Sequence, residues 1–555
     1  MMVVNMFILR TVHLRRIRQI VGVFYHLGFG TWIRAMKLSH LVPFRTRLAS
    51  AAHENDLSKN LRLALERLGG GFVKLGQMLS IRADLVGLET ALELRHLQDE
   101  VSPFPTGVVA TLIQEELKAP LKKFFKKINP VPAGSASLAQ VHRAILKNGS
   151  VVAIKILRPG IEELIKEDIL LLRWLAARIE KHLPAAHPFQ PVKVIEEFSE
   201  WTLRELNLVN EATNIGHSRA LFADEPRVFI PAVHWNLTTR RLLTTEFSDG
   251  IHIDDFSRYR AIKCSRAVVA KLGTEIVFRQ FFEFGFFHGD PHPGNFFLKP
   301  GNVICLHDFG IVGHLETPVR RELISCFVNF LEHDEEGVIK HLWHLAKTDD
   351  ATDTDGFKRD VTAILEKWFY SPTAGERIST AFYKTIIAGA SRGVIFPANI
   401  VLFAKAVMTM ESTALLLDPK FDIAKELQPY LKKIMTMEFK PDALIKQGRE
   451  ILLDSANLLD ELPEAARQLM KLAREEQFGV KIDTSEFSAI KKEIDRQADI
   501  RIISLILVAD LLATAVLLHL EGVQKIIGVP LGFAGVIIAA VLSFVVLIKL
   551  RKGAE

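Results

Sequence analysis

The chain has 555 residues, so a usual domain size of about 150 residues predicts three or four structural units. Its three cysteines, Cys264, Cys305 and Cys326, show no CxxC spacing. This pattern excludes a disulfide framework and a thiolate metal cage, and it favours a reducing compartment. Because 49% of the residues are hydrophobic and 24% are charged, a largely disordered chain is excluded as well.

Basic residues gather at the amino terminus. Residues 1–50 contain eight Lys or Arg and no Asp or Glu, so the remaining residues sum to −2 within a total of +6. A nucleic-acid-binding protein would spread basic charge along a working face, so we expect no nucleic acid partner. Apolar residues between the arginines fit a helix on anionic lipid, or equally the first helix of a packed domain. A mitochondrial transit peptide is disfavoured because serine is scarce and no cleavage signal follows.

The next segments change from helical to strand periodicity. Leu61, Leu65 and Leu68 are spaced as one helix face, within a helical stretch from about 54 to 130. Residues 135–156 predict two strands, because the β-branched run that ends at Lys155 follows Asn148-Gly149, a signal for a two-residue hairpin turn. Further along we expect helices over 161–220, strands over 227–247, and helices to about 480. The chain is therefore expected to be α+β, with a small sheet-bearing lobe followed by a larger helical lobe.

Chemistry concentrates between residues 288 and 310. The segment His288-Gly-Asp290-Pro-His-Pro-Gly-Asn295 is followed by Asp308-Phe-Gly, and Lys155 lies upstream on a predicted strand. Phosphoryl transfer needs a carboxylate that orients the acceptor and hard oxygen ligands for Mg²⁺. Asp290 suits the first role, and Asn295 and Asp308 suit the second. We expect His288 and His292 to make structural hydrogen bonds rather than to take part in catalysis.

The order of these residues resembles the protein-kinase-like fold, and three further segments resemble the AarF/UbiB atypical kinase family. The segment 72–80, Phe-Val-Lys-Leu-Gly-Gln-Met-Leu-Ser, matches its K-x-G-Q signature. The segment 132–140, Pro-Ala-Gly-Ser-Ala-Ser-Leu-Ala-Gln, resembles its Ala-rich loop. Glu205-Leu-Asn207, followed by Glu211, resembles its E-x-D-x-x-x-x-E segment. The resemblance runs from about residue 70 to 330 and implies a bilobal kinase-like fold with a helical amino-terminal extension.

The resemblance also implies ATP and Mg²⁺ as cofactors. Lys155 would contact the α- and β-phosphates and pair with Glu211, which would make both catalytic together with Asp290. Glu246 and Phe247 would offer backbone groups to adenine. The Ala-rich loop would cover the phosphates through Ala133, Gly134, Ser135, Ala136, Ser137, Leu138, Ala139 and Gln140.

The K-x-G-Q segment would act as a regulatory lid. In the family, its lysine, here Lys74, reaches the first Glu of the E-x-D segment, here Glu205, over the active-site cleft. Gly76 and Gln77 complete the signature. Such a lid would obstruct a polypeptide acceptor.

Two positions depart from the family pattern. Asn207 replaces the Asp of E-x-D, which puts a metal or proton role there in doubt. Gly134 lies among the alanines and would partly restore the close backbone approach to phosphate that Cβ atoms limit.

Two apolar runs end the chain. Residues 502–520 form an apolar run broken by Asp510 and His519, and residues 526–548 contain no charge. Each run is long enough to cross a bilayer, and the short link predicts a transmembrane helical hairpin. Lys and Arg flank both outer ends, which predicts that both ends and the catalytic domain are cytoplasmic. Asp510 would face a partner helix, an oligomer contact or a polar ligand, with a neutral hydrogen-bonded structural aspartate as the alternative.

Together these patterns divide the chain into six expected units. They are a basic amphipathic segment (1–53), a helical extension with K-x-G-Q (54–130), a kinase-like N-lobe with a helical insertion (131–250), a helical C-lobe and extension (251–480), a charged linker (481–500) and two transmembrane helices (501–555). The family resemblance implies a bacterial inner-membrane atypical kinase or ATPase in ubiquinone-type isoprenoid quinone biosynthesis. Its partners would be membrane lipid, quinone precursors and quinone-biosynthesis proteins.

Two alternatives stay open. One is a small-molecule phosphotransferase, since His288-Gly-Asp-x-His-Pro-Gly-Asn also resembles aminoglycoside and choline kinases. The other is a nucleotide-gated scaffold without catalysis. The phosphate acceptor and the oligomeric state are not indicated by the sequence.

Overall fold

The computed structural model describes residues 11–42, 56–97, 103–348, 352–370 and 377–438, with short pieces at 525–526, 529–530 and 540–541. The chain separates into two compact units, residues 1–443 and 444–555. The first unit has the mixed helix and sheet content expected of the α+β kinase-like fold, and it contains every expected site residue.

The sheet of the small lobe is built on the predicted hairpin. Strands β3 (Ala139–Leu146) and β4 (Val151–Leu157) pair antiparallel, with Ile145 opposite Val151. The turn differs from the expected two-residue type, because Leu146 N–H donates to Ser150 and only Gly149 has a positive φ, of 90°. A type I′ turn needs two left-handed residues, so the loop is one residue longer with glycine at its left-handed position.

The other strands of this sheet flank the hairpin. The order is β1-β3-β4-β6, and β2 also pairs with β3. These strands are β1 (Phe125–Ile128), β2 (Gly134–Ser135) and β6 (Leu242–Glu246). Strand β1 lies before residue 131, so the sheet begins inside the range expected for the helical extension. A four-residue alternation is too short to be told from a helix by periodicity.

One helix that precedes the first strand in the chain packs on this sheet. Val109 and Ile113 of α8 (Thr106–Leu117) are buried in one cluster with Val152 and Ile154 of β4. Helix α8 therefore belongs to the small lobe by packing, although it was expected in the extension.

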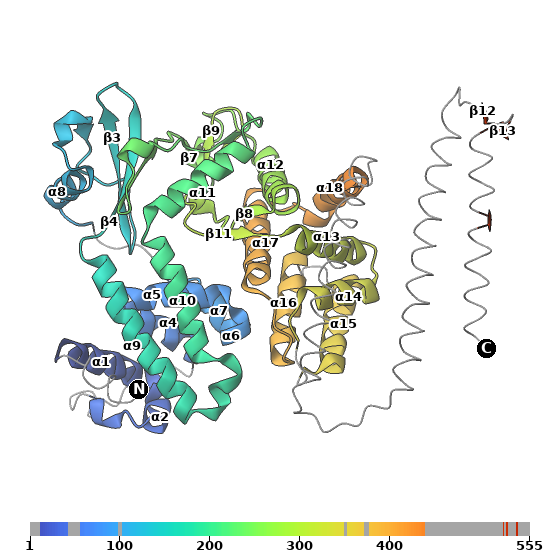
Figure 1. Cartoon of the computed structure of the whole chain (residues 1–555), viewed down its shortest axis with the longest axis horizontal. Coiled ribbons are helices and arrows are strands. Elements are labelled where there is room, and N and C mark those ends of the chain that lie inside the picture. Colours follow the sequence, from blue (N-terminus) through green and yellow to red (C-terminus); the bar gives the residue numbers. More distant parts are fainter. Residues whose placement is uncertain are drawn as a thin grey trace. The chain divides into compact units, whose positions relative to one another are not determined.

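Three helices occupy the region expected to be helical, 161–220, and connect β4 to the rest of the lobe. They are α9 (Ile161–His182), α10 (Pro191–Glu205) and α11 (Leu208–Leu221). Proline stands at the first position of α10, where its missing N–H is not needed. Asn207 caps α11 by accepting a hydrogen bond from Val209 N–H at 3.2 Å. Figure 1 shows α9 and α10 running from the sheet toward α1 and α2.

The helical extension packs on α9. It consists of α1 (Thr11–Phe24), α2 (Gly30–Ala35), α4 (Leu57–Leu68), α5 (Gly71–Ile81), α6 (Ala83–Val86) and α7 (Leu88–Leu94). Ile17 and Ile20 of α1 are buried in the same cluster as Ile165 of α9. Arg16 donates to the fully buried carboxylate of Asp168 at 3.1 Å. The alternative of a packed first helix therefore describes α1.

The large lobe combines two small sheets with seven helices in the described residues. Its strands are β5 (Val228–Phe229), β7 (Ile251–His252), β8 (Phe286–His288), β9 (Phe296–Lys299), β10 (Val303–Leu306) and β11 (Val312–His314). One sheet has the order β5-β10-β9-β7, and β8 pairs with β11. The helices are α12 (Arg266–Phe278), α13 (Thr317–Leu331), α14 (Glu335–Leu345), α15 (Thr354–Tyr370), α16 (Ile378–Ser391), α17 (Ala398–Leu417) and α18 (Ile423–Glu438).

Among the described helices, only α17 is long and apolar enough to cross a membrane, and 72% of its apolar window is buried in the protein. It is therefore a core helix of the large lobe. The predicted spans 502–520 and 526–548 lie almost entirely outside the described residues, so the hairpin stays a prediction. Residues Lys525–Ile526 (β12) and Val529–Pro530 (β13) pair antiparallel.

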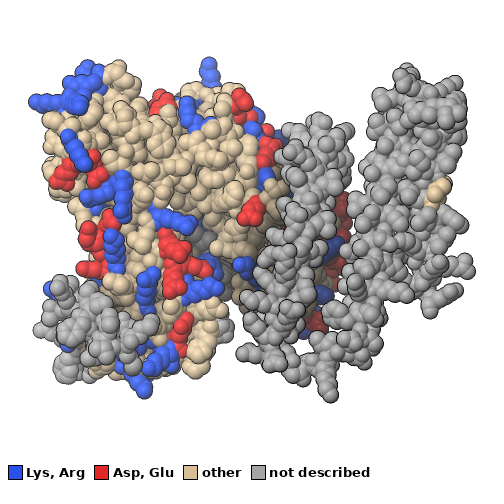
Figure 2. Space-filling model, viewed as in Figure 1, with Lys and Arg blue, Asp and Glu red and all other residues tan. Residues whose placement is uncertain are grey.

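The surface over α9 and α10 carries both signs of charge. On the face drawn in Figure 2, Lys and Arg alternate with Asp and Glu over this region. Glu162 pairs with Lys166 and Arg240 at 2.8 Å each, and Arg82 pairs with Glu197 at 2.7 Å. Solvent-exposed pairs of this kind contribute little stability, about 0–1 kcal/mol each.

Candidate active site

The loop of residues 289–295, called the catalytic loop below because it carries Asp290, connects β8 to β9 and is held by His288. This buried side chain accepts a hydrogen bond from Asp290 N–H at 3.1 Å through Nδ1, and its Nε2 contacts the carbonyl oxygen of His307 at 2.9 Å. His292 accepts from Gly294 N–H at 3.2 Å. Both histidines thus make the structural hydrogen bonds that were expected of them.

Asn295 and Asp308 meet at one end of the β9–β10 hairpin. The two strands pair Leu306 with Phe296, and His307 N–H donates to the carbonyl oxygen of Asn295 at 3.0 Å. The Asn295 amide nitrogen donates to the Asp290 carbonyl oxygen at 3.1 Å, which leaves its side-chain oxygen to face another group. Asp308 adopts a φ of 52°, and its Oδ1 accepts from Gly310 N–H at 3.2 Å.

Lys155 lies between two carboxylates. Its ammonium contacts both oxygens of Glu211 at 2.9 and 2.8 Å, and Asp308 Oδ1 at 3.6 Å. Burial by itself would lower the pKa of Lys155, but the charges of Asp308 and Glu211 outweigh burial and raise it. Lys155 in turn holds the pKa of Asp308 at about 2. Both groups are therefore charged near neutral pH.

Helix α11 couples this ion pair to the Asp-Phe-Gly segment. Glu211 lies in its first turn, and one turn later Asn214 donates to the carbonyl oxygen of Phe309 at 2.9 Å. The Phe309 side chain is buried and its ring lies 5.4 Å from that of His288. Lys155, the Asp308-Phe-Gly segment and the catalytic loop are thus connected through α11 and Phe309.

The expected lid contact is present. Lys74 of α5 donates to Glu205 Oε1, at the end of α10, at 2.9 Å, and both side chains are largely buried. The charge of Lys74 contributes to the low pKa of Asp308, and that of Glu205 to the raised pKa of Lys155. The pair therefore lies within electrostatic range of Lys155 and Asp308.

The other residues of the K-x-G-Q segment have different surroundings. Gly76 is a packing residue, because a Cβ there would come 2.3 Å from Leu97 Cδ1 and 2.8 Å from Leu65 Cδ1. Gln77 is half-buried on the same helix, and its carbonyl oxygen accepts from the Ser80 hydroxyl at 2.6 Å.

The Ala-rich loop is only partly available to a ligand. Ala133 and Gly134 are exposed, and Ser135 and Ala136 are half-buried, whereas Ser137, Leu138, Ala139 and Gln140 are buried. The Gln140 side chain contacts the backbone of Phe104 and the ring of His142, so it belongs to the lobe core. The part of the loop that a phosphate could reach is thus shorter than the eight residues expected, because residues 137–140 are buried.

Arg158 holds the outer part of this loop. Its guanidinium donates to the carbonyl oxygen of Ala136 at 2.7 Å and to the Ser135 hydroxyl at 2.8 Å. At Gly134, a Cβ would meet nothing within 4 Å in the protein, so the chain itself does not require glycine there.

Glu246 and Phe247 lie at the end of β6, where the small lobe leads into the large one. Their N–H groups already donate to Ala232 and Val151, at 2.8 and 3.1 Å. Adenine would therefore have to use carbonyl oxygens here or backbone groups further along the chain. The expectation that Glu246 and Phe247 offer backbone groups to adenine therefore stays a prediction for their carbonyl oxygens.

The donor set at the centre fits Mg²⁺. Asp308 is ionised. Asn295 uses its amide nitrogen for the hydrogen bond to Asp290, so its side-chain oxygen can face a metal ion. The buried Glu205 Oε2 has no hydrogen-bond partner. Hard oxygen donors of this kind are what Mg²⁺ prefers. Asn295 and Asp308 would hold the ion, which would neutralise phosphate charge when bound.

A basic pair near Asp290 was not foreseen from the sequence. Lys405 of α17 places its ammonium 3.3 Å from Asp290 Oδ1. Arg95, which follows α7, donates to Met408 Sδ of the same helix at 3.8 Å, and its charge interacts with Asp290. The only local signal was a lysine within a 20-residue apolar helix.

A second group of side chains that could bind a metal ion lies on α13 and α14. His341 and His344 each place Nδ1 near Glu322 Oε2, at 2.7 and 3.1 Å. Their ligand atoms lie within 4.8 Å of one another. The three side chains satisfy one another by hydrogen bonding and come from elements other than those that carry Asp290 and Asp308.

Comparisons with known proteins show which family the chain belongs to. A family model described as the ABC1 atypical kinase-like domain matches residues 96–342. A probable protein kinase UbiB from Shewanella denitrificans is 31% identical over 470 residues, covering 83% of this chain and 86% of the relative. Another from Shewanella oneidensis is 33% identical over 421 residues, covering 75% and 77%. The chain belongs to the AarF/UbiB atypical kinase family.

Among solved structures, the complex of Rv3197 with erythromycin from Mycobacterium tuberculosis is 22% identical, with a TM-score of 0.45, and covers 64% of this chain and 90% of that one. The ABC1 match contains Lys155, Glu211, Asp290, Asn295 and Asp308. Lys74 lies before the matched residues of this AarF/UbiB protein.

Proposed function

We propose that the protein is a membrane-anchored atypical kinase or ATPase that binds Mg-ATP and supports ubiquinone-type isoprenoid quinone biosynthesis at the bacterial cytoplasmic membrane. The observation that carries the proposal is the position of Lys155, between Glu211 at 2.8 Å and Asp308 at 3.6 Å. This arrangement pre-orients an ammonium for the nucleotide phosphates beside a carboxylate for the metal. The family relatives are named probable protein kinase UbiB, which supports the same reading.

The residues divide the work of phosphoryl transfer. Lys155 would bind the α- and β-phosphates, and Asn295 and Asp308 would hold Mg²⁺, which neutralises developing charge when bound. Asp290 would orient the acceptor hydroxyl or water and take its proton. The intact set favours turnover over a purely gated scaffold.

The lid limits the acceptor. Because Lys74 and Glu205 are joined at 2.9 Å and largely buried, α5 is tied to α10 next to the site. A long polypeptide would be obstructed there, whereas a small or lipid-embedded hydroxyl compound, or water, would not. The predicted carboxyl-terminal spans would bring the site to a bilayer that holds quinone precursors.

Phosphate release by the detergent-solubilised protein tests the proposal, measured with and without a polyprenyl-phenol mimic and against Asp290→Asn. We expect release by the wild type, a change on adding the mimic, and a large loss in the variant. Nucleotide binding without any release would favour the scaffold instead.

Nucleotide binding is measured separately by thermal shift. Mg-ADP at 100 times its Kd should stabilise the wild type by about 2.7 kcal/mol. Asp308→Asn should reduce the Mg²⁺-dependent part, and Lys155→Ala should reduce binding with or without metal. No stabilisation of the wild type at millimolar Mg-nucleotide would refute the kinase-like function.

A further inference from the structure

A lysine is buried in an apolar helix directly behind the catalytic-loop aspartate. Helix α17 has 20 residues, of which only Lys405 and Glu411 are charged. Lys405 is 8% exposed, and its ammonium lies 3.3 Å from Asp290 Oδ1. The two residues are 115 positions apart, so only the fold brings them together.

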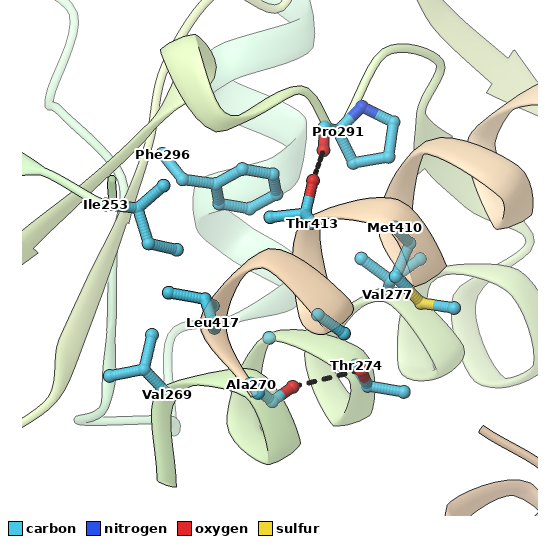
Figure 3. A pocket seen from close by; sticks show the side chains of 12 residues that line it. Ile253, Val269, Ala270, Thr274, Val277, Pro291, Phe296, Met410, Thr413 and Leu417 are labelled. Carbon is cyan, nitrogen blue, oxygen red and sulfur yellow. Dashed lines mark hydrogen bonds between the residues drawn. The ribbon is translucent and has the colours of Figure 1, made fainter. Parts of the chain in front are cut away.

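The register of α17 explains how the ammonium reaches this place. Leu402 lies against the catalytic loop, since a Cβ at Gly289 would come 3.1 Å from its Cδ1. Thr413 donates through its hydroxyl to the Pro291 carbonyl oxygen at 3.3 Å, as Figure 3 shows. Positions 402, 405, 409 and 413 share one helix face. This face runs along the loop and delivers Lys405 to Asp290.

The helix is otherwise closely packed at this point. An apolar space of about 20 Å³ lies next to Pro291, and its lining includes Met410, Thr413, Leu417, Ile253 and Phe296 (Figure 3). That space holds no more than a water molecule. The part of α17 next to Pro291 is therefore closely packed against the large lobe.

Fold stability alone does not call for a lysine here. Burial, and to a smaller extent the charge of Arg95, lower the pKa of Lys405, whereas the carboxylate of Asp290 opposes this shift. Replacing buried ion pairs with apolar residues is often neutral or stabilising. The pair is thus better explained by what it does for the carboxylate.

The exposure of the two side chains shows which side is open. The Asp290 side chain is 33% exposed and that of Lys405 only 10%, so the lysine lies behind the carboxylate. His292, the histidine within the loop, is exposed and accepts a hydrogen bond from Gly294 N–H.

We propose that Lys405 is a positioning residue for Asp290, fixing Oδ1 from below so that the other oxygen faces the acceptor. This inference rests on the proposed function. In the step it serves, the acceptor oxygen bonds to the γ-phosphorus, the bond from that phosphorus to the β–γ bridging oxygen breaks, ADP leaves, and the acceptor proton passes to Asp290.

The test uses the full-length protein in detergent with three variants. Lys405→Met keeps the length and removes the charge, and Lys405→Arg keeps the charge. Glu411→Gln is the matched control, because Glu411 is a buried charge on the same helix that accepts hydrogen bonds from the Ser379 backbone and hydroxyl instead. Nucleotide affinity, kcat and melting temperature are measured for each.

We expect Lys405→Met to bind Mg-ADP like the wild type and to lose about 10- to 100-fold in kcat, the scale of a small misplacement of a reacting group. Lys405→Arg should recover part of the loss, and Glu411→Gln should change melting temperature without a selective loss of kcat. If Lys405→Met does not fold, Lys405→Gln takes its place.

Three results overturn the inference. They are a kcat within about twofold of the wild type in the neutral variant, an equal kcat loss in Glu411→Gln, and nucleotide binding by the wild type without turnover. The third result, and likewise an absence of Mg-nucleotide binding in the wild type, overturns the proposed function as well, whereas the first two results leave the proposed function standing.

Discussion

At the residue scale, the contact between Lys74 and Glu205 joins side chains 131 positions apart at 2.9 Å. If it holds a lid, Lys74→Ala and Glu205→Ala should each raise self-phosphorylation or change nucleotide turnover, because either change frees α5 from α10. The double variant should match the single ones rather than double their effect. A coupling energy of about 0.5–3 kcal/mol is expected for residues in contact.

The exposed pair Lys271–Glu426, at 3.0 Å, is the matched control for this cycle. Its coupling should be near the ~0.2–1 kcal/mol typical of surface pairs, with unchanged turnover. Additive effects of the Lys74 and Glu205 changes, or efficient phosphorylation of unrelated proteins by the wild type, would contradict the lid hypothesis.

A second residue-scale prediction concerns acid stability. Glu225, between α11 and β5, receives two hydrogen bonds from the Arg227 guanidinium at 2.7 and 2.8 Å, and its side chain is 13% exposed. Hydrogen bonding from Arg227 lowers the pKa of Glu225 to about 2. Because the folded-state pKa lies below the unfolded one, the stabilisation is complete above about pH 4.5 and is lost as the pH falls toward 2.

Glu225→Gln should therefore lower the free energy of unfolding by about 1 kcal/mol at pH 7, after allowing for solvent screening of the half-exposed arginine. Denaturant midpoints of the variant and the wild type should converge as the pH falls from 4.5 to 3. Asp249→Asn, at a carboxylate that is 83% exposed, should show almost no difference at any pH. A constant gap between Glu225→Gln and wild type across this range would contradict the assignment.

At the element scale, α5 is placed by a close approach that only glycine allows. Gly76→Ala would push a methyl group into Leu97 and Leu65, and overpacking of this kind costs about 1–3 kcal/mol. We expect lower stability together with a displaced Lys74, so lid coupling to Glu205 should weaken in the same variant. Thermal unfolding and the self-phosphorylation assay measure the two effects.

Gly107→Ala in α8 is the matched helical control, because a Cβ there meets nothing within 4 Å. Alanine should stabilise that helix by up to about 1 kcal/mol. If Gly76→Ala is as stable as the wild type, α5 has room to move and the lid is not fixed by packing.

At the scale of the whole molecule, attachment to the bilayer is predicted to reside in the two carboxyl-terminal runs. Deleting 502–550 should release the protein from membranes, or leave only attachment through the basic first 50 residues that salt removes, because electrostatic binding is screened and apolar burial is not. Flotation with vesicles at low and high salt measures this. A reporter fused at residue 555 should be cytoplasmic, and a periplasmic signal would exclude the hairpin.

The sequence by itself determined the residues whose roles depend on local spacing. The order of Lys155, Asp290, Asn295 and Asp308, and the K-x-G-Q match at Lys74, led to the family and to pairs that the structure contains. The β3–β4 hairpin was predictable for the same reason, since strand alternation and turn residues act over a few positions. These signals depend only on residues that are close together in the sequence, so they can be recognised without the structure.

The tertiary structure decided what lies opposite these residues. Lys405 approaches Asp290, Arg16 pairs with the buried Asp168, and Gln140 turns into the lobe core rather than toward a nucleotide. From the sequence, Lys405 is only a charged residue in an apolar helix. The sequence pattern does not say which distant carboxylate compensates its charge. That choice is made by packing, where one helix face fits one loop and burial forces the ammonium to find a partner.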